Sequence, residues 1–270
     1  MRLYHSLASM DAFRAVACLP NNFCYLVSAY YLFKNPQMRA NCQKIIRDSA
    51  KVMLDSGMVS ALYAGDSSWS TRSDYISSLA RNLPFHSVVA MDIPNNRDLL
   101  ARIGMTIPEA GAVTLQNAQH FLAGYIPQKK IFVLQGGTGK DYERMAGEYE
   151  RMGLFAESER KVGFAVGSLP RRSWREVVEI VRICRESVPR KFSLHVFGIG
   201  SDERLVELSV LGVDSADSAT ASRAAAYGYA ISPKSGKRLP LSPVNSSGRS
   251  ALVAWNISAL EALRSISADN

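Results

Sequence analysis

The sequence predicts an α/β fold, the (β/α)8 TIM barrel, built as a single domain. Along the whole chain, apolar runs of strand length alternate with amphipathic runs of helical spacing, a pattern that favours a parallel sheet covered by helices. The chain has 270 residues, of which 47% are hydrophobic and 21% charged, and no change in composition divides it. Because this length suits one large domain, we expect residues 1–270 to form one barrel.

Four strands and two helices are predicted in the first half of the chain. The strands cover residues 2–9, 23–33, 51–57 and 87–94. They are rich in aromatic, β-branched and other apolar residues, as strands usually are. Amphipathic sequence at 37–50 and 70–83 predicts the helices, the second with Ser70 or Thr71 as its N-cap.

The second half repeats the alternation and ends in a different kind of segment. The predicted strands cover residues 129–137, 161–169, 191–200 and 212–218. The predicted helices cover residues 108–125, 140–155, 173–188 and 202–211. After the eighth strand, residues 219–250 are rich in Ser, Pro and Gly and predict a basic, loop-rich segment. Residues 251–270 predict a closing C-terminal helix.

Polar residues gather where the third to eighth strands end. They include Asp55, Asp92, Gln135, Ser168 and Asp217. A single aspartate after a strand caps the following helix about as often as it serves chemistry. In a parallel barrel, however, all carboxyl ends meet at one mouth, where the active site lies. The set as a whole therefore predicts a functional site.

The overall charge favours a polyanionic partner. The formal net charge is +8, which is typical of nucleic-acid binding, although a solvated basic surface would give the same value. No apolar run reaches the length that spans a membrane, and the start of the chain lacks the apolar core of a secretory signal. A cytoplasmic protein without membrane contact is the resulting expectation.

Neither the cysteines nor the histidines have the spacing of metal ligands. The four cysteines lie far apart, without a C-x-x-C pair or a disulfide framework, and we expect them to be reduced thiols. Among the four histidines, His195 alternates within a predicted strand, so we expect it in the barrel core or behind the site residues. No metal site is predicted.

Six motifs at the strand ends carry a family resemblance. They are LDSG at 54–57, MDIP at 91–94, LQGG at 134–137, GFAVGSL at 163–169, VFGIGSDERL at 196–205 and GVDSADSATASRAAAYG at 212–228. In this order they resemble the motifs of the tRNA-guanine transglycosylase (queuine/archaeosine tRNA-ribosyltransferase) superfamily. The last motif aligns Asp217, Arg223 and Gly228 without a gap to the nucleophilic aspartate, the first arginine and the closing glycine of the family pattern.

The resemblance implies a pentosyltransferase, a guanine transglycosylase. Asp217 would be the nucleophile that attacks C1′ of the target nucleoside, forming a covalent aspartyl-nucleoside intermediate that shields the sugar cation from water. Asp55 would be the general acid and base that moves a proton to the leaving base and from the incoming one.

The resemblance also implies five base-binding residues. Asp92 would accept the donors on the amine edge of guanine, while Gln135 and the backbone N–H of Ser168 would face O6 and N7. Leu169 next to Ser168, and Ser56 in the LDSG motif, complete the expected pocket.

Two departures from the family pattern bear on which nucleic acid is the expected substrate. No cysteine follows Cys184, so the zinc subdomain of bacterial members is expected to be missing and no cofactor is implied. The second arginine of the family pattern is Ala226 here. Both features help the tRNA enzymes to hold an anticodon loop. The resemblance is therefore strongest to the DNA-modifying branch, which inserts a 7-deazaguanine such as a preQ0-like base into DNA.

Residues 219–250 supply the expected contacts with the nucleic-acid backbone. Their basic residues are Arg223, Lys234, Lys237, Arg238 and Arg249, and the segment has no acidic residue. Such residues neutralise phosphates without reading sequence. A solvated tail, an enzyme of the tRNA branch and a non-catalytic nucleic-acid-binding barrel stay open as alternatives, as does assembly into a homodimer.

Overall fold

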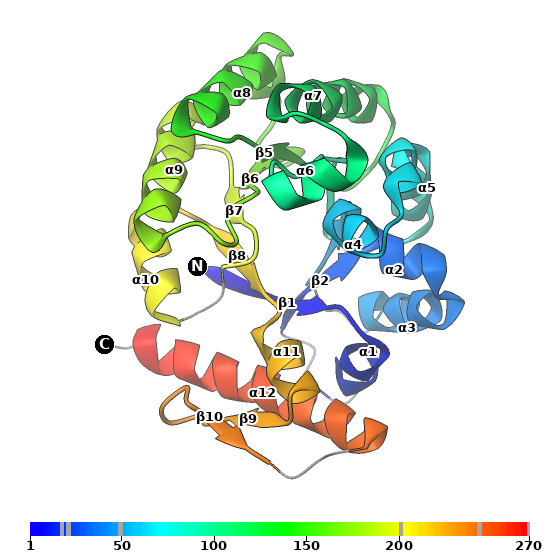
Figure 1. The fold of residues 1–270 in the computed structure, drawn as a ribbon, viewed down its shortest axis with the longest axis vertical. Helices are drawn as coiled ribbons and strands as arrows, with labels where there is room; N and C mark the ends of the chain where they lie inside the picture. The colour runs from blue at the N-terminus through cyan, green and yellow to red at the C-terminus, as the bar shows by residue number, and fades with distance from the viewer. Residues whose placement is uncertain (17–18, 20–22, 48–50, 200–201, 242–244, 269–270) are drawn as a thin grey trace.

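A parallel barrel forms the centre of the molecule (Figure 1). The computed structural model describes residues 1–16, 19, 23–47, 51–199, 202–241 and 245–268. Within them, eight parallel strands close in chain order, which confirms the predicted (β/α)8 fold as a single domain. The strands are β1 (Arg2–Leu7), β2 (Cys24–Ser28), β3 (Lys51–Asp55), β4 (Ser87–Val89), β5 (Lys129–Leu134), β6 (Val162–Val166), β7 (Leu194–Val196) and β8 (Ser215–Ser218).

Helices surround the barrel and bury the outer face of its strands (Figure 1). They are α1 (Met10–Val16), α2 (Ala29–Lys34), α3 (Pro36–Arg47), α4 (Met58–Tyr63), η1 (Ser67–Thr71), α5 (Ser73–Asn82), α6 (Arg97–Ile103), α7 (Ile107–Ala123), α8 (Gly139–Arg151), η2 (Leu154–Ala156), α9 (Trp174–Ser187), α10 (Asp202–Val210), α11 (Thr220–Ala226) and α12 (Ser246–Ala268). A separate cluster of buried side chains fills the barrel interior and makes a packed floor below the mouth. It consists of Tyr4, Leu26, Met53, Val89, Ile131, Val133 and Ala165.

The prediction of one strand over 23–33 was too long. β2 ends at Ser28, and the aromatic residues that follow form α2, which ends at Lys34 with Asn35 as its C-cap. Tyr30 is buried there with its ring 5.2 Å from that of Trp69. Burial against this neighbour overrides the strand preference of aromatic residues, which reflects packing more than the backbone itself.

The segment from 70 to 103 differs from its prediction in three ways. Neither Ser70 nor Thr71 caps α5, because both lie in η1 and donate their hydroxyls to carbonyls three residues earlier, while Arg72 stands at the N-cap. The fourth strand ends at Val89 rather than at residue 94. An unpredicted helix, α6, follows, with Asn96 as a cap that accepts from the N–H of Asp98.

The segment after β8 is more regular than a loop. Arg223 lies on the helix α11, and a two-stranded antiparallel hairpin follows, formed by β9 (Tyr229–Ile231) and β10 (Arg238–Pro240). In Figure 1 the hairpin lies on the side of α12 that faces away from the barrel. The closing helix α12 begins at Ser246, earlier than predicted. No helix in the described ranges combines the length and the apolar character needed to cross a bilayer.

Asn256 joins this C-terminal segment to the rest of the molecule. It is fully buried on α12, accepts from the N–H of Ile231 at 2.7 Å and donates to the carbonyls of Ala221 and Tyr229 at 3.2 and 3.0 Å. One side chain thus satisfies backbone groups of α11 and of β9.

Replacing Asn256 should destabilise the fold. The Asn256→Ala change leaves three backbone groups without partners, so we expect the free energy of unfolding to fall by on the order of 3 kcal/mol. Urea denaturation followed by circular dichroism measures it. Ser258→Ala, an exposed position on the same helix, is the control and should change stability by less than about 0.5 kcal/mol. Equal urea midpoints for Asn256→Ala and the unchanged protein would contradict the anchoring role.

Candidate active site

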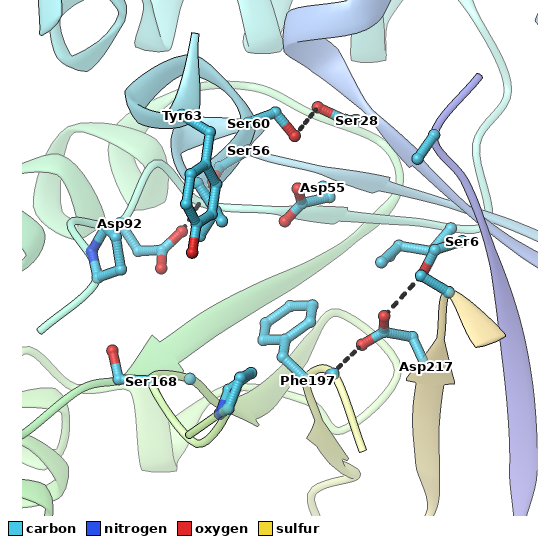
Figure 2. A pocket seen from close by; sticks show the side chains of 18 of the residues that line it. Ser6, Ser28, Asp55, Ser56, Ser60, Tyr63, Asp92, Ser168, Phe197 and Asp217 are labelled. Atoms are coloured by element: carbon cyan, nitrogen blue, oxygen red, sulfur yellow. Dashed lines mark hydrogen bonds between the residues drawn. The ribbon is translucent and has the colours of Figure 1, made fainter. Parts of the chain in front are cut away.

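A cavity of about 300 Å³ opens at the carboxyl ends of the barrel strands (Figure 2). Six of the predicted site residues line it: Asp55, Ser56, Asp92, Gln135, Ser168 and Asp217. The size is within the range of small-molecule sites, about 300–1,000 Å³. The barrel therefore brings together polar residues that are separated by up to 162 positions in the sequence, from 55 to 217.

Asp217 is buried at the end of β8 and held at both carboxylate oxygens. Its Oδ2 accepts from the hydroxyl of Ser6 at 2.7 Å, and its Oδ1 accepts from the N–H of Gly198 at 2.7 Å (Figure 2). Gly198 has φ +73°, a left-handed conformation that glycine adopts without strain. One donor from β1 and one from the turn after β7 thus orient the carboxylate that lines the cavity.

Asp55 ends β3 on another wall of the same cavity (Figure 2). Burial raises the pKa of Asp55 to about 7, and the negative charges of Asp92 and Asp217 add to the rise. The N–H of Gly57, which donates to Oδ2 at 3.0 Å, opposes it. A carboxyl with this pKa can both give and take a proton near neutral pH.

Gly57 is required at the turn after β3. It has φ +80°, and a Cβ at this position would lie 2.6 Å from the backbone nitrogen of Tyr30. A side chain there would push α2 and α4 apart and withdraw the N–H from Asp55. The glycine thus allows the close approach on which the Asp55 hydrogen bond depends.

Four residues form a hydrogen-bonded chain along one wall of the cavity. Asp92 accepts from Ser56 Oγ at 2.8 Å and from Gln135 Nε2 at 2.5 Å. Gln135 in turn accepts at Oε1 from Ser168 Oγ at 2.5 Å. Burial raises the pKa of Asp92, and the hydrogen bonds from Ser56 and Gln135 partly offset the rise. The chain fixes the orientation of the Gln135 amide, which the sequence alone does not define.

Ser168 holds an uncommon backbone conformation. Its φ is +58°, which places it in the left-handed region, and its Oγ accepts from the N–H of Asn95 at 2.7 Å. Arg172, which the sequence analysis did not single out, donates to the carbonyls of Ser168, Gly136 and Gly137 at 3.0, 2.8 and 3.1 Å. These contacts lock the loops after β5 and β6 together at the edge of the cavity.

Several predicted residues do not reach the cavity. The Leu169 side chain is fully buried and is not part of the lining. The five basic residues of 219–250 do not line the cavity either. Three of them, Lys234, Lys237 and Arg238, are exposed on or near the hairpin. Arg249 forms an ion pair with Asp11 at 3.0 Å, which uses part of its charge within the protein.

Other lining residues were missed. Ser6 lies near the carboxyl end of β1 and contacts Asp217, while Tyr63 of α4, 52% exposed, and Phe197 after β7 bring aromatic rings to the cavity (Figure 2). Ser6 and Phe197 follow the rule that site residues end barrel strands, so their positions could have been predicted. No pattern in the sequence points to Tyr63.

The pKa of Asp55 predicts a pH-dependent cost in stability. The carboxyl ionises near pH 4 in the unfolded chain and near pH 7 in the folded chain. The free energy of unfolding therefore falls as pH rises between these two values, and the full loss is reached above about pH 7. We expect Asp55→Asn to stabilise the protein by a few kcal/mol at pH 8 and by much less at pH 5. Urea unfolding at both pH values measures the gain. Glu143→Gln, an exposed carboxylate on α8, is the control; an equal gain at pH 5 and 8 for Asp55→Asn would refute the raised pKa.

Among the described residues, no three His, Cys, Asp or Glu side chains are arranged to hold a metal ion. The expectation that the zinc subdomain is missing stays a prediction.

Comparison with known protein families identifies the chain. The family model described as queuine tRNA-ribosyltransferase, TGT, matches residues 88–259, which is well over half of the sequence. The match includes Asp92, Gln135, Ser168 and Asp217, whereas Asp55 precedes it. Among curated proteins, none matches the chain. On the strength of the family match, the chain belongs to the queuine tRNA-ribosyltransferase family, within the tRNA-guanine transglycosylase superfamily.

Proposed function

We propose that this protein is a base-exchange transglycosylase that replaces guanine in DNA with a 7-deazaguanine derivative, a preQ0-like base, through a covalent aspartyl-nucleoside intermediate. The family is one of pentosyltransferases that act on nucleic acid and guanine bases. The observation that carries the proposal is the pairing of Asp217, fixed at both oxygens, with Asp55, whose pKa of about 7 suits proton transfer, in one cavity.

The exchange needs two steps with the same groups. In the first, an oxygen of Asp217 forms a bond to C1′, the bond from C1′ to N9 of guanine breaks, and its electron pair leaves with the base. Asp55 supplies the proton that the departing guanine takes up. In the second step the incoming base gives a proton to Asp55, its nitrogen attacks C1′, and the ester bond to Asp217 breaks. Two displacements retain the configuration of the sugar.

The chain of hydrogen bonds around Asp92 supports binding of a guanine-like base. Each Asp92 oxygen accepts one hydrogen bond within the protein and has a lone pair left for the N1 and amine hydrogens of such a base. The Gln135 amide has a second N–H that can donate to O6. Tyr63 and Phe197 provide aromatic rings in the same cavity for stacking (Figure 2).

The choice of DNA over tRNA rests on the sequence departures and on charge. The second arginine of the family pattern is Ala226, and no cysteine follows Cys184. Four of the five basic residues of 219–250, all except Arg249, are exposed, and Arg223 lies on α11 directly after β8. An extended single strand with an extruded base needs charge and a pocket rather than a grip on a folded loop.

Incorporation of a labelled base tests the proposal directly. The protein is incubated with a radiolabelled 7-deazaguanine and, in parallel, with DNA or unmodified tRNA, and each polymer is digested to nucleosides for mass analysis. We expect label in DNA. Label in tRNA alone would overturn the DNA assignment and leave the exchange chemistry standing, whereas label in neither would favour a non-catalytic barrel.

Replacing Asp217 should abolish the exchange. We expect Asp217→Ala to lower incorporation by at least about 10³-fold, because the covalent step loses its nucleophile, while binding of nucleic acid stays within a few fold. Asp74→Ala, an exposed position on α5, is the control and should leave both unchanged. Undiminished incorporation by Asp217→Ala would exclude the covalent mechanism.

Replacing Asp92 should weaken every guanine-like base alike. An amide presents donors to the amine edge, so we expect Asp92→Asn to raise the dissociation constants of guanine and of 7-deazaguanines by about 10- to 100-fold without changing their order. Isothermal titration of the free bases measures the constants. Wild-type affinity in this variant would remove Asp92 from the pocket.

A further inference from the structure

His195 lies directly behind Asp217 and is not part of the chemistry described so far. It is 2% exposed in the middle of β7, with its ring 5.7 Å from that of Tyr4 and 4.8 Å from that of Phe197. Its Nδ1 lies 2.9 Å from Ser215 Oγ. Its Nε2 is buried without a hydrogen-bond partner and lies 3.5 Å from Asp217 Oδ1.

The surroundings favour a proton on Nε2. A neutral imidazole carries one proton, and the serine hydroxyl can donate to Nδ1 or accept from it. With the proton on Nδ1, the lone pair of Nε2 would face a carboxylate oxygen at 3.5 Å, an unfavourable contact in a buried place. With Ser215 donating, Nε2–H instead faces Asp217. Tyr4 offers no charge to change this preference, because burial raises the pKa of its phenol to about 12.

The two oxygens of Asp217 therefore differ in their surroundings. Oδ1 accepts from the N–H of Gly198 and faces Nε2 of His195, whereas Oδ2 accepts only the Ser6 hydroxyl among the described hydrogen bonds. A hydroxyl can rotate away, but a backbone N–H and a buried ring cannot. Oδ2 is thus the oxygen that can be released for a reaction.

We propose that His195 is a positioning residue that donates from Nε2 to Asp217 Oδ1 and so leaves Oδ2 as the atom that attacks C1′. This inference rests on the proposed function. When Oδ2 bonds to C1′, the carboxylate becomes an ester, and Oδ1 becomes its carbonyl oxygen. Oδ1 then keeps both donors, while Ser6 gives up its bond to the bridging oxygen. Hydrogen bonds of this kind are often long in a free enzyme and shorten in the reacting complex.

Two variants at His195 separate donation from packing. His195→Phe keeps a ring between Tyr4 and Phe197 and removes the donor, and we expect the rate of covalent complex formation to fall by about 10- to 100-fold with a KM for the base within about twofold. His195→Gln brings an amide nitrogen close to the place of Nε2 and should recover most of the rate. His120→Phe, an exposed histidine on α7, is the matched control.

A spectroscopic measurement tests the contact without any substrate. Nitrogen and proton NMR of the unmodified protein should show the His195 proton on Nε2, and its signal should move in Asp217→Ala. A proton on Nδ1, or an unchanged signal in that variant, would overturn the proposal. So would full activity of His195→Phe. If the unmodified protein incorporates no base into any polymer, the proposed function fails, and the NMR result still decides whether His195 donates to Asp217.

Discussion

The gathering of three carboxylates in one cavity, two of them buried and Asp55 partly buried, with neutral donors around them, is the constraint on which the site depends. Asp55, Asp92 and Asp217 accept their hydrogen bonds from serine hydroxyls, a glutamine amide and the N–H groups of glycines. In the described part of the chain, no lysine or arginine forms an ion pair with any of them. A nearby cation would favour ionisation of all three. Without one, burial and mutual repulsion raise the pKa of Asp55 to about 7.

Two of these donors lie in tight turns that follow strands. Gly57 and Gly198 have left-handed backbones at φ +80° and +73°, and they donate their N–H groups to Asp55 and Asp217. Ser168 also has a left-handed backbone, at φ +58°, and Arg172 donates hydrogen bonds to its carbonyl and to those of Gly136 and Gly137. Because these turns follow β3, β6 and β7 of one closed barrel, the barrel fixes the carboxylates relative to one another.

The sequence predicts the barrel and most of the cavity, and the reasons for its failures are physical. Asp55, Asp92, Gln135 and Asp217 could be found because strand alternation places them at carboxyl ends, which meet in any closed parallel barrel. The contact of Ser6 with Asp217 depends on the register of β1 against β8, more than 200 positions apart, which no local pattern encodes. The same limit hid α2, where Tyr30 is buried against Trp69, a residue far along the chain.

The raised pKa of Asp55 has a consequence for the path of protons during turnover. With a pKa raised to about 7, the Asp55 carboxyl can hold or release its proton near neutral pH. In the proposed exchange, the proton given to a departing base is replaced by the one that the next base brings. The reaction is then a closed cycle in which no net proton passes to bulk water. Hydrogen removed from an entering base can then reappear on the guanine that leaves in the following round.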